Sequence, residues 1–360
     1  MDDLYFVGGD VCYRGSGIDL TGEKGVDQMD QEIIRRRYKA VAIAAFVIAT
    51  ALLVMRIVSY YVQIALIDSE MDEAWLNLLL DAIFTVPVQV FILLLFPLFY
   101  FRKVEGGFPG VCEMSNYRKT DYRICLIAVL LGLLAPLVSV GVSLAWQIIL
   151  IILGYTPSSA DTVLPGSFNA AYFILSIFLP EVLPAVCEEF VNRGGLLTAM
   201  SKTHGKVKTI VLVGIAFGLF HQYIMQSAYT AVFGAVLAFI TLQSGSVYPA
   251  MIIHFMNNAF SVYMENAEYY GWAVGGNFYN ALNDVLTGNF AVAAAMYAVV
   301  LAAFFGLLVW IWRISKKSNR VTSINCCVAY KPTKKEKAFY IGAIVMTVIS
   351  TFITYLFNVV

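Results

Sequence analysis

Charged residues are scarce in this chain. Asp, Glu, Lys and Arg together make up 13% of its 360 residues, whereas soluble domains average roughly 25%. Hydrophobic residues reach 60%, and the mean hydropathy is +0.75. This composition excludes a water-soluble globular protein.

Other absences exclude further classes of protein. The 24 basic residues match 24 acidic ones, so no basic excess could hold a phosphate backbone, and we expect no nucleic-acid partner. The six cysteines lack metal-ligand spacing apart from the adjacent Cys326 and Cys327, and they indicate no disulfide framework. Residues 1–31 have no basic start followed by an apolar core, so they do not form a cleavable signal peptide. We expect residues 1–34 to be a polar cytoplasmic tail.

Long apolar runs are what the chain has in abundance. A membrane core about 30 Å thick needs about 20 residues of helix, and a β-barrel would instead alternate polar and apolar residues. The sequence therefore predicts an all-α fold, a polytopic transmembrane helical bundle of nine spans, or of eight because no polar break marks Ala228. The runs are residues 40–67, 75–101, 124–153, 168–190, 209–227, 228–243, 247–264, 289–312 and 338–358.

Lysine and arginine are confined to four stretches of the sequence. Six lie before residue 40, five from Arg102 to Arg123, four from Arg193 to Lys208 and eight from Arg313 to Lys337, which is 23 of 24. Nine alternating spans put all four stretches on one side, and cytoplasmic loops are the ones enriched in these residues. We therefore expect an integral, multi-pass membrane protein whose N-terminus is cytoplasmic and whose C-terminus, if there are nine spans, lies on the outer side of the membrane.

Arg56 is the single basic residue inside an apolar run. A charge in lipid needs a partner or a watery cavity, and Asp81 in the second run is the candidate partner. Neither a repeat nor a linker between soluble domains is evident. Residues 35–360 are therefore expected to form one transmembrane domain.

The fourth run ends in two adjacent acids. Pro180 and Pro184 bracket an acid and predict a kinked helix. Glu189 and Arg193 are four positions apart, with the acid first, which is the favourable order for an ion pair. Glu188 points about 100° away around the helix. It is free to face a cavity, and we expect it to be the base that takes a proton from water.

Two of the three histidines lie within apolar runs. His221 follows Phe217 by four positions and His254 precedes Asn258 by four, so each pair shares a helix face. An aromatic ring could orient His221, while an imidazole and a carboxamide could donate hydrogen bonds to an oxyanion. Each residue also has a purely structural interpretation, as an ordinary ion pair or a helix-packing hydrogen bond. Their concentration in three consecutive segments favours a functional site.

Three motifs resemble the CAAX protease and bacteriocin-processing family, also called type II CAAX prenyl endopeptidases or the abortive-infection family of intramembrane proteases. The EExxxR motif runs from Glu188 to Arg193, FxxxH from Phe217 to His221, and HxxxN from His254 to Asn258. The resemblance covers roughly residues 125–265, which we expect to hold the protease-like core.

The resemblance implies roles for these residues. Glu188 would activate water with help from His221, while His254 and Asn258 would stabilise the oxyanion, and Glu189 and Arg193 would support them. Glu188, His221 and His254 are also candidate ligands of zinc or another divalent metal, although the histidines do not share one helix as in HExxH. The implied partners are membrane lipid and a peptide or protein substrate, such as a prenylated protein or a bacteriocin precursor.

The leading hypothesis is therefore an intramembrane endopeptidase that cleaves a peptide bond near the cytoplasmic side of the bilayer. A catalytically silent membrane scaffold or bacteriocin-immunity protein of the same fold is the alternative. A transporter is a third class, since broken helices and intramembrane acids are typical of transporters, but no repeat symmetry supports it.

Overall fold

The computed structural model describes residues 4–7, 10–13, 28–66, 68–155, 163–277, 284–285, 287–318 and 323–357. Near the N-terminus, β1 (Leu4–Val7) and β2 (Asp10–Tyr13) pair as an antiparallel hairpin. Most of the remainder of the expected tail lies outside the described residues. The first helix begins at Gln28, before the residue 34 boundary expected from hydropathy.

Helices account for nearly all of the described membrane domain, and several rods contain π-helical segments, labelled η. In chain order the elements are α1 (Gln28–Ala65), α2 (Glu73–Val86), η1 (Pro87–Leu95), α3 (Phe96–Glu105), α4 (Phe108–Met114), α5 (Tyr122–Ile152), α6 (Ala170–Ile177), η2 (Phe178–Val182), α7 (Leu183–Glu189), η3 (Phe190–Leu196), α8 (Leu197–Ser201), α9 (Lys206–Phe220), α10 (Ile224–Ser244), α11 (Tyr248–Tyr269), α13 (Phe290–Lys317) and α14 (Lys334–Phe357).

The helical membrane fold predicted from hydropathy is confirmed. By length and composition, seven of the described segments can cross a membrane, and each of the nine predicted runs corresponds to one helical rod. The rods formed by α9 and α11 are not among these seven. Helix α9 has 15 residues, which is short for a span, and α11 contains the polar residues His254 and Asn258. The seven segments are Gln31–Ala65, Glu73–Glu105, Tyr122–Ile152, Ala170–Ser201, Ile224–Ser244, Phe290–Lys317 and Lys334–Leu356.

Two predicted helix ends are wrong. The break expected at Ala228 lies at His221–Tyr223, where Gln222 adopts a left-handed backbone with φ 55° and separates α9 from α10. The fourth rod, expected to stop at residue 190, continues to Ser201. Its polar continuation remains helical because Asn192 and Arg193 are buried within protein rather than in a loop. Glu188 therefore lies well inside its rod and not at its end.

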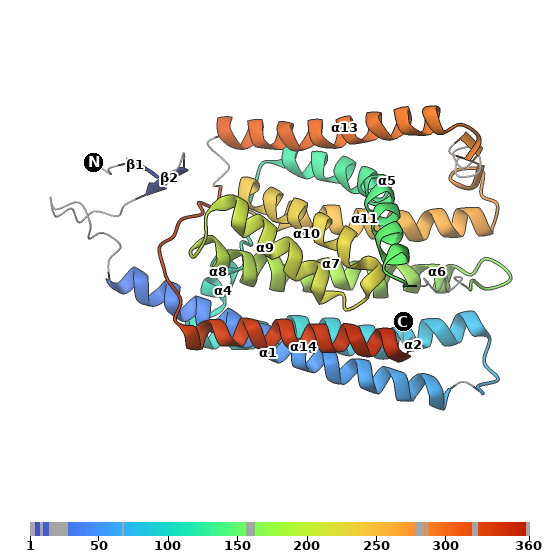
Figure 1. The fold of residues 1–360 in the computed structure, drawn as a ribbon, viewed down its shortest axis with the longest axis horizontal. Coiled ribbons are helices and arrows are strands. Elements are labelled where there is room, and N and C mark those ends of the chain that lie inside the picture. The colour runs from blue at the N-terminus through green and yellow to red at the C-terminus, as the bar shows by residue number, and fades with distance from the viewer. Residues whose placement is uncertain are drawn as a thin grey trace.

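The helices form three layers (Figure 1). Helices α5 and α13 lie on one side, α1 and α14 on the other, and α9, α10 and α11 between them. The closest packing joins α1 to α14, α9 to α10, and α5 to α11. The first and last spans therefore lie side by side although they are far apart in sequence.

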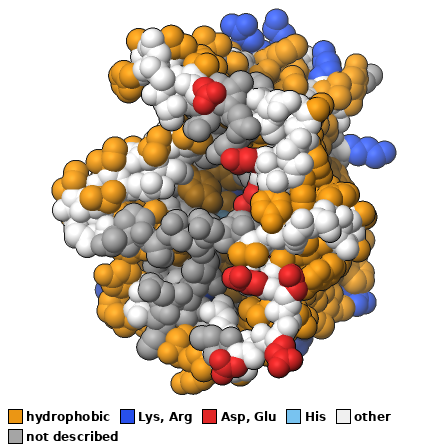
Figure 2. Space-filling model, turned by 90° about the vertical axis from the view of Figure 1, so that its right-hand side faces the viewer, with side chains coloured by type: hydrophobic (Ala, Val, Ile, Leu, Met, Phe, Trp, Pro, Cys, Tyr) orange, Lys and Arg blue, Asp and Glu red, His pale blue; other side chains and the backbone are white. Residues whose placement is uncertain are grey.

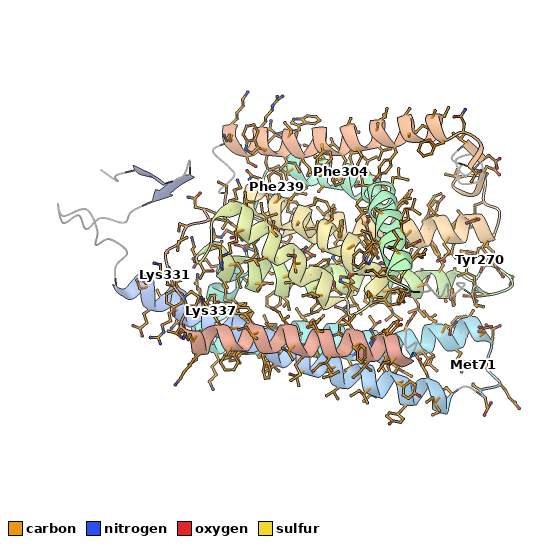
Figure 3. The ribbon with its side chains drawn as sticks, in the orientation of Figure 1. Met71, Phe239, Tyr270, Phe304, Lys331 and Lys337 are labelled. Atoms are coloured by element: carbon orange, nitrogen blue, oxygen red, sulfur yellow. The ribbon has the colours of Figure 1, made fainter. Side chains whose placement is uncertain are left out.

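Basic and acidic side chains are concentrated at opposite ends of the bundle. Figure 3 places Lys331 and Lys337 at one end and Met71 and Tyr270 at the other. Figure 2 views the second end, where Asp and Glu side chains border a central hollow and Lys and Arg appear only at the margins. This distribution agrees with the loop charges from which the orientation in the membrane is predicted.

The ion pair expected between Arg56 and Asp81 is absent. Both side chains line a cavity of about 270 Å³, but among the described residues no ion pair joins them within 4.0 Å. Ser59 and Gln63 also line this cavity, so each charge meets a polar space rather than hydrocarbon.

Candidate active site

Glu188 occupies the middle of the fourth rod, in α7. The residue is 7% exposed, and Nε2 of Gln89 donates a hydrogen bond of 2.9 Å to its Oε1. Its other oxygen, Oε2, is buried and has no hydrogen-bond partner among the described residues. Gln89 lies in η1, 99 positions away, so the second rod positions one carboxylate oxygen and leaves the other unpaired.

Glu189 has a different role from its neighbour. Nη1 of Arg193 donates to its Oε1 at 2.8 Å, and both side chains are 0% exposed. Nδ1 of His254 lies 3.0 Å from the same oxygen. Nη2 of Arg193 donates to the Gly234 carbonyl at 3.1 Å. The spacing correctly predicts the Glu189–Arg193 pair, and the structure adds His254 and the backbone of α10 to it.

The Phe217 ring connects the two histidines to the buried ion pair. The guanidinium carbon of Arg193 lies 4.3 Å from the ring centroid, within the range of a cation–π contact. His221 and His254 meet the same ring edge to face, with centroids 4.8 and 5.8 Å away. The Phe217 ring therefore contacts His221, as the four-residue spacing suggests, and it also contacts His254.

A hydrogen bond to the last turn of α9 holds the His221 ring. Its Nδ1 lies 2.8 Å from the Phe217 carbonyl oxygen. A carbonyl oxygen only accepts, so Nδ1 carries the proton and the neutral ring keeps a lone pair on Nε2. Because His221 caps α9, its ring is held at a helix end instead of within a continuous span as the sequence suggests.

The four candidate catalytic residues line one cavity of about 700 Å³. Glu188 comes from α7, His221 from the end of α9, and His254 and Asn258 from α11. The Asn258 amide oxygen accepts a hydrogen bond of 2.8 Å from Nδ2 of Asn257. Helix α5 and the first half of α10 complete the wall. The arrangement brings an unpaired carboxylate oxygen, two imidazoles and a carboxamide to the same polar space.

Gln89 and Glu181 are among the polar residues of this site that sequence reasoning missed. Gln89 holds Glu188, and its only signal in the sequence is a polar residue two positions after Pro87 in a predominantly apolar run. Glu181 is 8% exposed and lines the same cavity. It stands one residue after Pro180, within the kink that the prolines predict, and η2 forms there.

The candidate metal ligands do not form a metal site in this arrangement. Among the described residues, no group of three or more His, Cys, Asp or Glu is placed so that it could hold a metal ion. Glu188, His221 and His254 line a shared cavity without gathering around one point as ligands. The geometry therefore does not fit a metal held by these three residues.

Comparison with known proteins points to a protease family. Residues 170–260 match the family model described as Type II CAAX prenyl endopeptidase Rce1-like. No match to the chain was found among curated proteins or solved structures. The matched segment contains all four candidate catalytic residues together with Glu189, Arg193 and Phe217.

The match confirms the resemblance carried by the three motifs. The family points to a peptidase that acts on peptide or protein substrates in the membrane, and the apolar helices agree with an integral, multi-pass protein. Residues 170–260 of the chain are thus similar to the Rce1-like type II CAAX prenyl endopeptidase family.

Proposed function

We propose that the protein is an intramembrane endopeptidase in which Glu188 activates the water that attacks a peptide carbonyl. The observation that carries this proposal is the buried, unpaired Oε2 of Glu188, in the wall of a cavity that His221, His254 and Asn258 share. Gln89 holds the other oxygen of this carboxylate, Oε1. The carboxylate is therefore oriented so that Oε2 can take part in proton transfer.

In this proposal, Glu188 accounts for every proton that is transferred in the reaction. Glu188 takes a proton from water as the water oxygen bonds to the carbonyl carbon, and it returns that proton to the amine nitrogen as the C–N bond breaks. The Nε2 lone pair of His221 can accept a hydrogen bond from the same water. Water is thus the nucleophile, and no covalent acyl-enzyme is formed.

His254 and Asn258 would stabilise the tetrahedral intermediate. The Asn258 side chain has an N–H donor for the oxyanion, and His254 provides a second donor when its ring is protonated. Glu189 holds Nδ1 of His254 at 3.0 Å, as a carboxylate orients a histidine in other hydrolytic sites. Arg193 holds Glu189 in turn, so this buried pair positions His254 without contacting substrate.

The substrate would be a peptide segment that reaches the cavity from within the membrane. The family resemblance suggests a prenylated protein or a bacteriocin precursor. The polar lining, which includes Ser139, Ser143 and Gln147 of α5, can bond the peptide groups of an unwound segment, as hydrolysis requires.

The decisive experiment compares membranes that contain the wild-type protein with membranes that contain Glu188→Gln. Mass spectrometry of membrane peptides should find a substrate cut only by the wild type and uncut in the variant. Glu268→Gln, which changes an exposed acid outside the cavity, is the matched control. Identical peptide profiles for wild type and Glu188→Gln would contradict the proposal and favour a silent scaffold or immunity protein.

We also propose that residues 35–360 form one transmembrane domain with a cytoplasmic N-terminus and a C-terminus outside. The basic loops support this orientation. Reporter fusions at the two termini should then give opposite locations. Two termini on the same side would show that one of the nine rods does not cross.

A further inference from the structure

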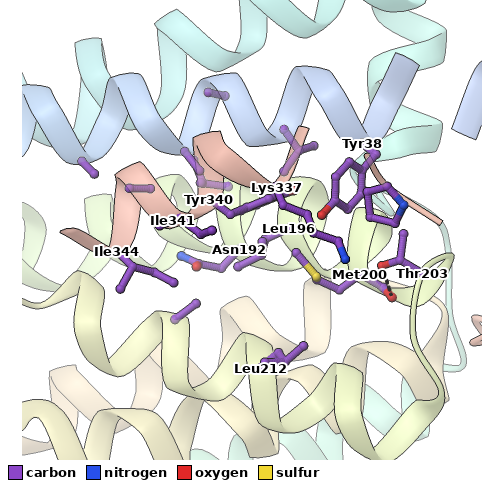
Figure 4. Close-up of a pocket in the computed structure, with 18 of the residues that line it drawn as sticks. Tyr38, Asn192, Leu196, Met200, Thr203, Leu212, Lys337, Tyr340, Ile341 and Ile344 are labelled. Atoms are coloured by element: carbon purple, nitrogen blue, oxygen red, sulfur yellow. Dashed lines mark hydrogen bonds between the residues drawn. The ribbon is translucent and has the colours of Figure 1, made fainter. Parts of the chain in front are cut away.

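A large apolar cavity lies away from the candidate active site, between the first and last spans and the core. It has a volume of about 830 Å³ and is walled by α1, α14, η3, α8 and α9. Helix α14 packs closely along α1 but only lightly against α9, so the described side chains leave a space between α14 and the core. Figure 4 shows Ile341 and Ile344 of α14 facing it, with Leu196 and Leu212 among its other walls.

One end of this cavity is basic. Lys208, Lys331 and Lys337 line it, together with His204, and no Asp or Glu is among its described lining residues. None of these three lysines takes part in an ion pair of the described residues. Figure 4 shows Lys337, Tyr38 and Thr203 toward one end and Ile344 toward the other. The cavity therefore has the polarity of an amphiphile, with a cationic mouth and an apolar interior.

The positive potential at this mouth also acts on His204. Its ring accepts or donates one hydrogen bond with Thr203, at 2.9 Å. Burial and the nearby Lys208 lower the pKa of the His204 imidazole. A group that brings negative charge to the mouth would relieve this repulsion.

We propose that the cavity holds one anionic phospholipid of the surrounding membrane. An acyl chain would lie along α14 and α9, and the phosphate would bind Lys208, Lys331 and Lys337. From Lys337 to Thr347, which both line the cavity, α14 rises about 15 Å at 1.5 Å per residue, enough for much of an acyl chain. An anionic headgroup is favoured over a zwitterionic one because none of the described residues that line the mouth is an acid that could pair with a headgroup ammonium.

A lipid at this position would join the last span to the core. It would fill the gap between α14 and α9 and so contribute apolar contacts that the described residues do not make there. Phe220 lines both this cavity and the small cavity that reaches Glu188 and His221. The Phe220 side chain therefore lies between the proposed lipid site and the small cavity.

The test measures lipid binding and needs no substrate. Delipidated, purified protein is titrated with phosphatidylglycerol or with phosphatidylcholine, both dioleoyl, and the thermal unfolding midpoint and native mass spectra are recorded. We expect phosphatidylglycerol to raise the midpoint more than phosphatidylcholine does and to add the mass of one lipid. The triple variant Lys208→Gln/Lys331→Gln/Lys337→Gln should weaken the apparent affinity for phosphatidylglycerol at least tenfold. A tenfold loss corresponds to about 1.4 kcal/mol of binding free energy.

Two control variants distinguish lipid binding at this cavity from a general effect of positive charge and from loss of the fold. Lys103→Gln/Lys119→Gln/Lys317→Gln removes the same charge from exposed lysines outside the cavity and should leave affinity unchanged. Ala216→Phe fills the apolar interior and should abolish the lipid adduct while the mouth stays basic. Equal responses of the wild type to both lipids, or equal losses in both lysine triples, would overturn the proposal.

Discussion

His254 places Nδ1 3.0 Å from Oε1 of Glu189, a residue 65 positions earlier in the chain. The same oxygen accepts from Arg193. One buried carboxylate oxygen therefore links the first and third sequence motifs directly, and Phe217 of the second motif packs against both Arg193 and His254. The three motifs form one contiguous cluster, and several of the predictions below follow from it.

Replacing Arg193 should destabilise the protein strongly. Arg193→Met leaves Glu189 charged in a fully buried position, and breaking a buried pair by removing one partner costs about 3–5 kcal/mol of unfolding free energy. Denaturant titration in detergent measures this loss. Arg123→Met is the matched control, since its pair with Asp121 is largely exposed on the arginine side and should cost less than about 1 kcal/mol. Equal stabilities of the two variants would show that the buried pair does not support the fold.

Glu188→Gln should remove activity and leave the fold intact. An amide cannot take a proton from water, so cleavage should fall by about 10²-fold or more. The amide oxygen can still accept the hydrogen bond from Gln89, so the unfolding midpoint should stay near that of the wild type. A peptide-cleavage assay on reconstituted protein measures the first effect. Substantial residual turnover would rule out Glu188 as the base.

Gln89→Leu should lower kcat more than it raises KM. The residue donates to Oε1 of Glu188 and positions the base without contacting the reacting atoms. A hydrogen bond to a charged group contributes about 1.5–3 kcal/mol, so a loss of at least tenfold in kcat is expected. Gln63→Leu is the control, because Gln63 bonds Ser59 in the neighbouring small cavity. A change in KM alone would instead assign Gln89 to substrate binding.

Gly218→Ala should destabilise the contact between α9 and α10. A Cβ at this position would lie 2.5 Å from the Ser227 carbonyl oxygen, which is helix backbone. Overpacking of this kind typically costs about 1–3 kcal/mol. At Gly306 in α13, a Cβ meets nothing within 4 Å, so Gly306→Ala should be neutral or stabilising by up to about 1 kcal/mol through helix propensity. Unfolding midpoints that fall equally would contradict the close approach.

Activity should not depend on a stoichiometric divalent metal. Glu188, His221 and His254 do not converge as ligands, and the proposed step uses Glu188 alone as the base. Cleavage should therefore persist after chelation and dialysis, with elemental analysis confirming that zinc is absent. Loss of activity together with one equivalent of zinc, and recovery on adding it back, would require a different ligand arrangement.

The features that could be predicted are those with a local cause. Apolar runs of span length predict the rods because each backbone group in lipid must be bonded within its own helix. The Glu189–Arg193 pair follows from four-residue spacing on one helix. Predictions failed where polar residues are surrounded by other parts of the protein and not by lipid or water. Hydropathy ends the fourth rod at residue 190, but the structure continues it to Ser201. The pairing of Arg56 with Asp81 failed because each meets a polar cavity instead.

By itself, the sequence determined that this is a helical membrane protein, which residue types are concentrated in its motifs, and which neighbours along one helix face can pair. Only the tertiary structure decided that Gln89 holds Glu188 across 99 positions, that His254 shares an oxygen of Glu189 with Arg193, and that His221 sits at a helix end. The physical reason is that helix periodicity specifies which face a side chain takes. The packing of one rod against another specifies what that face meets.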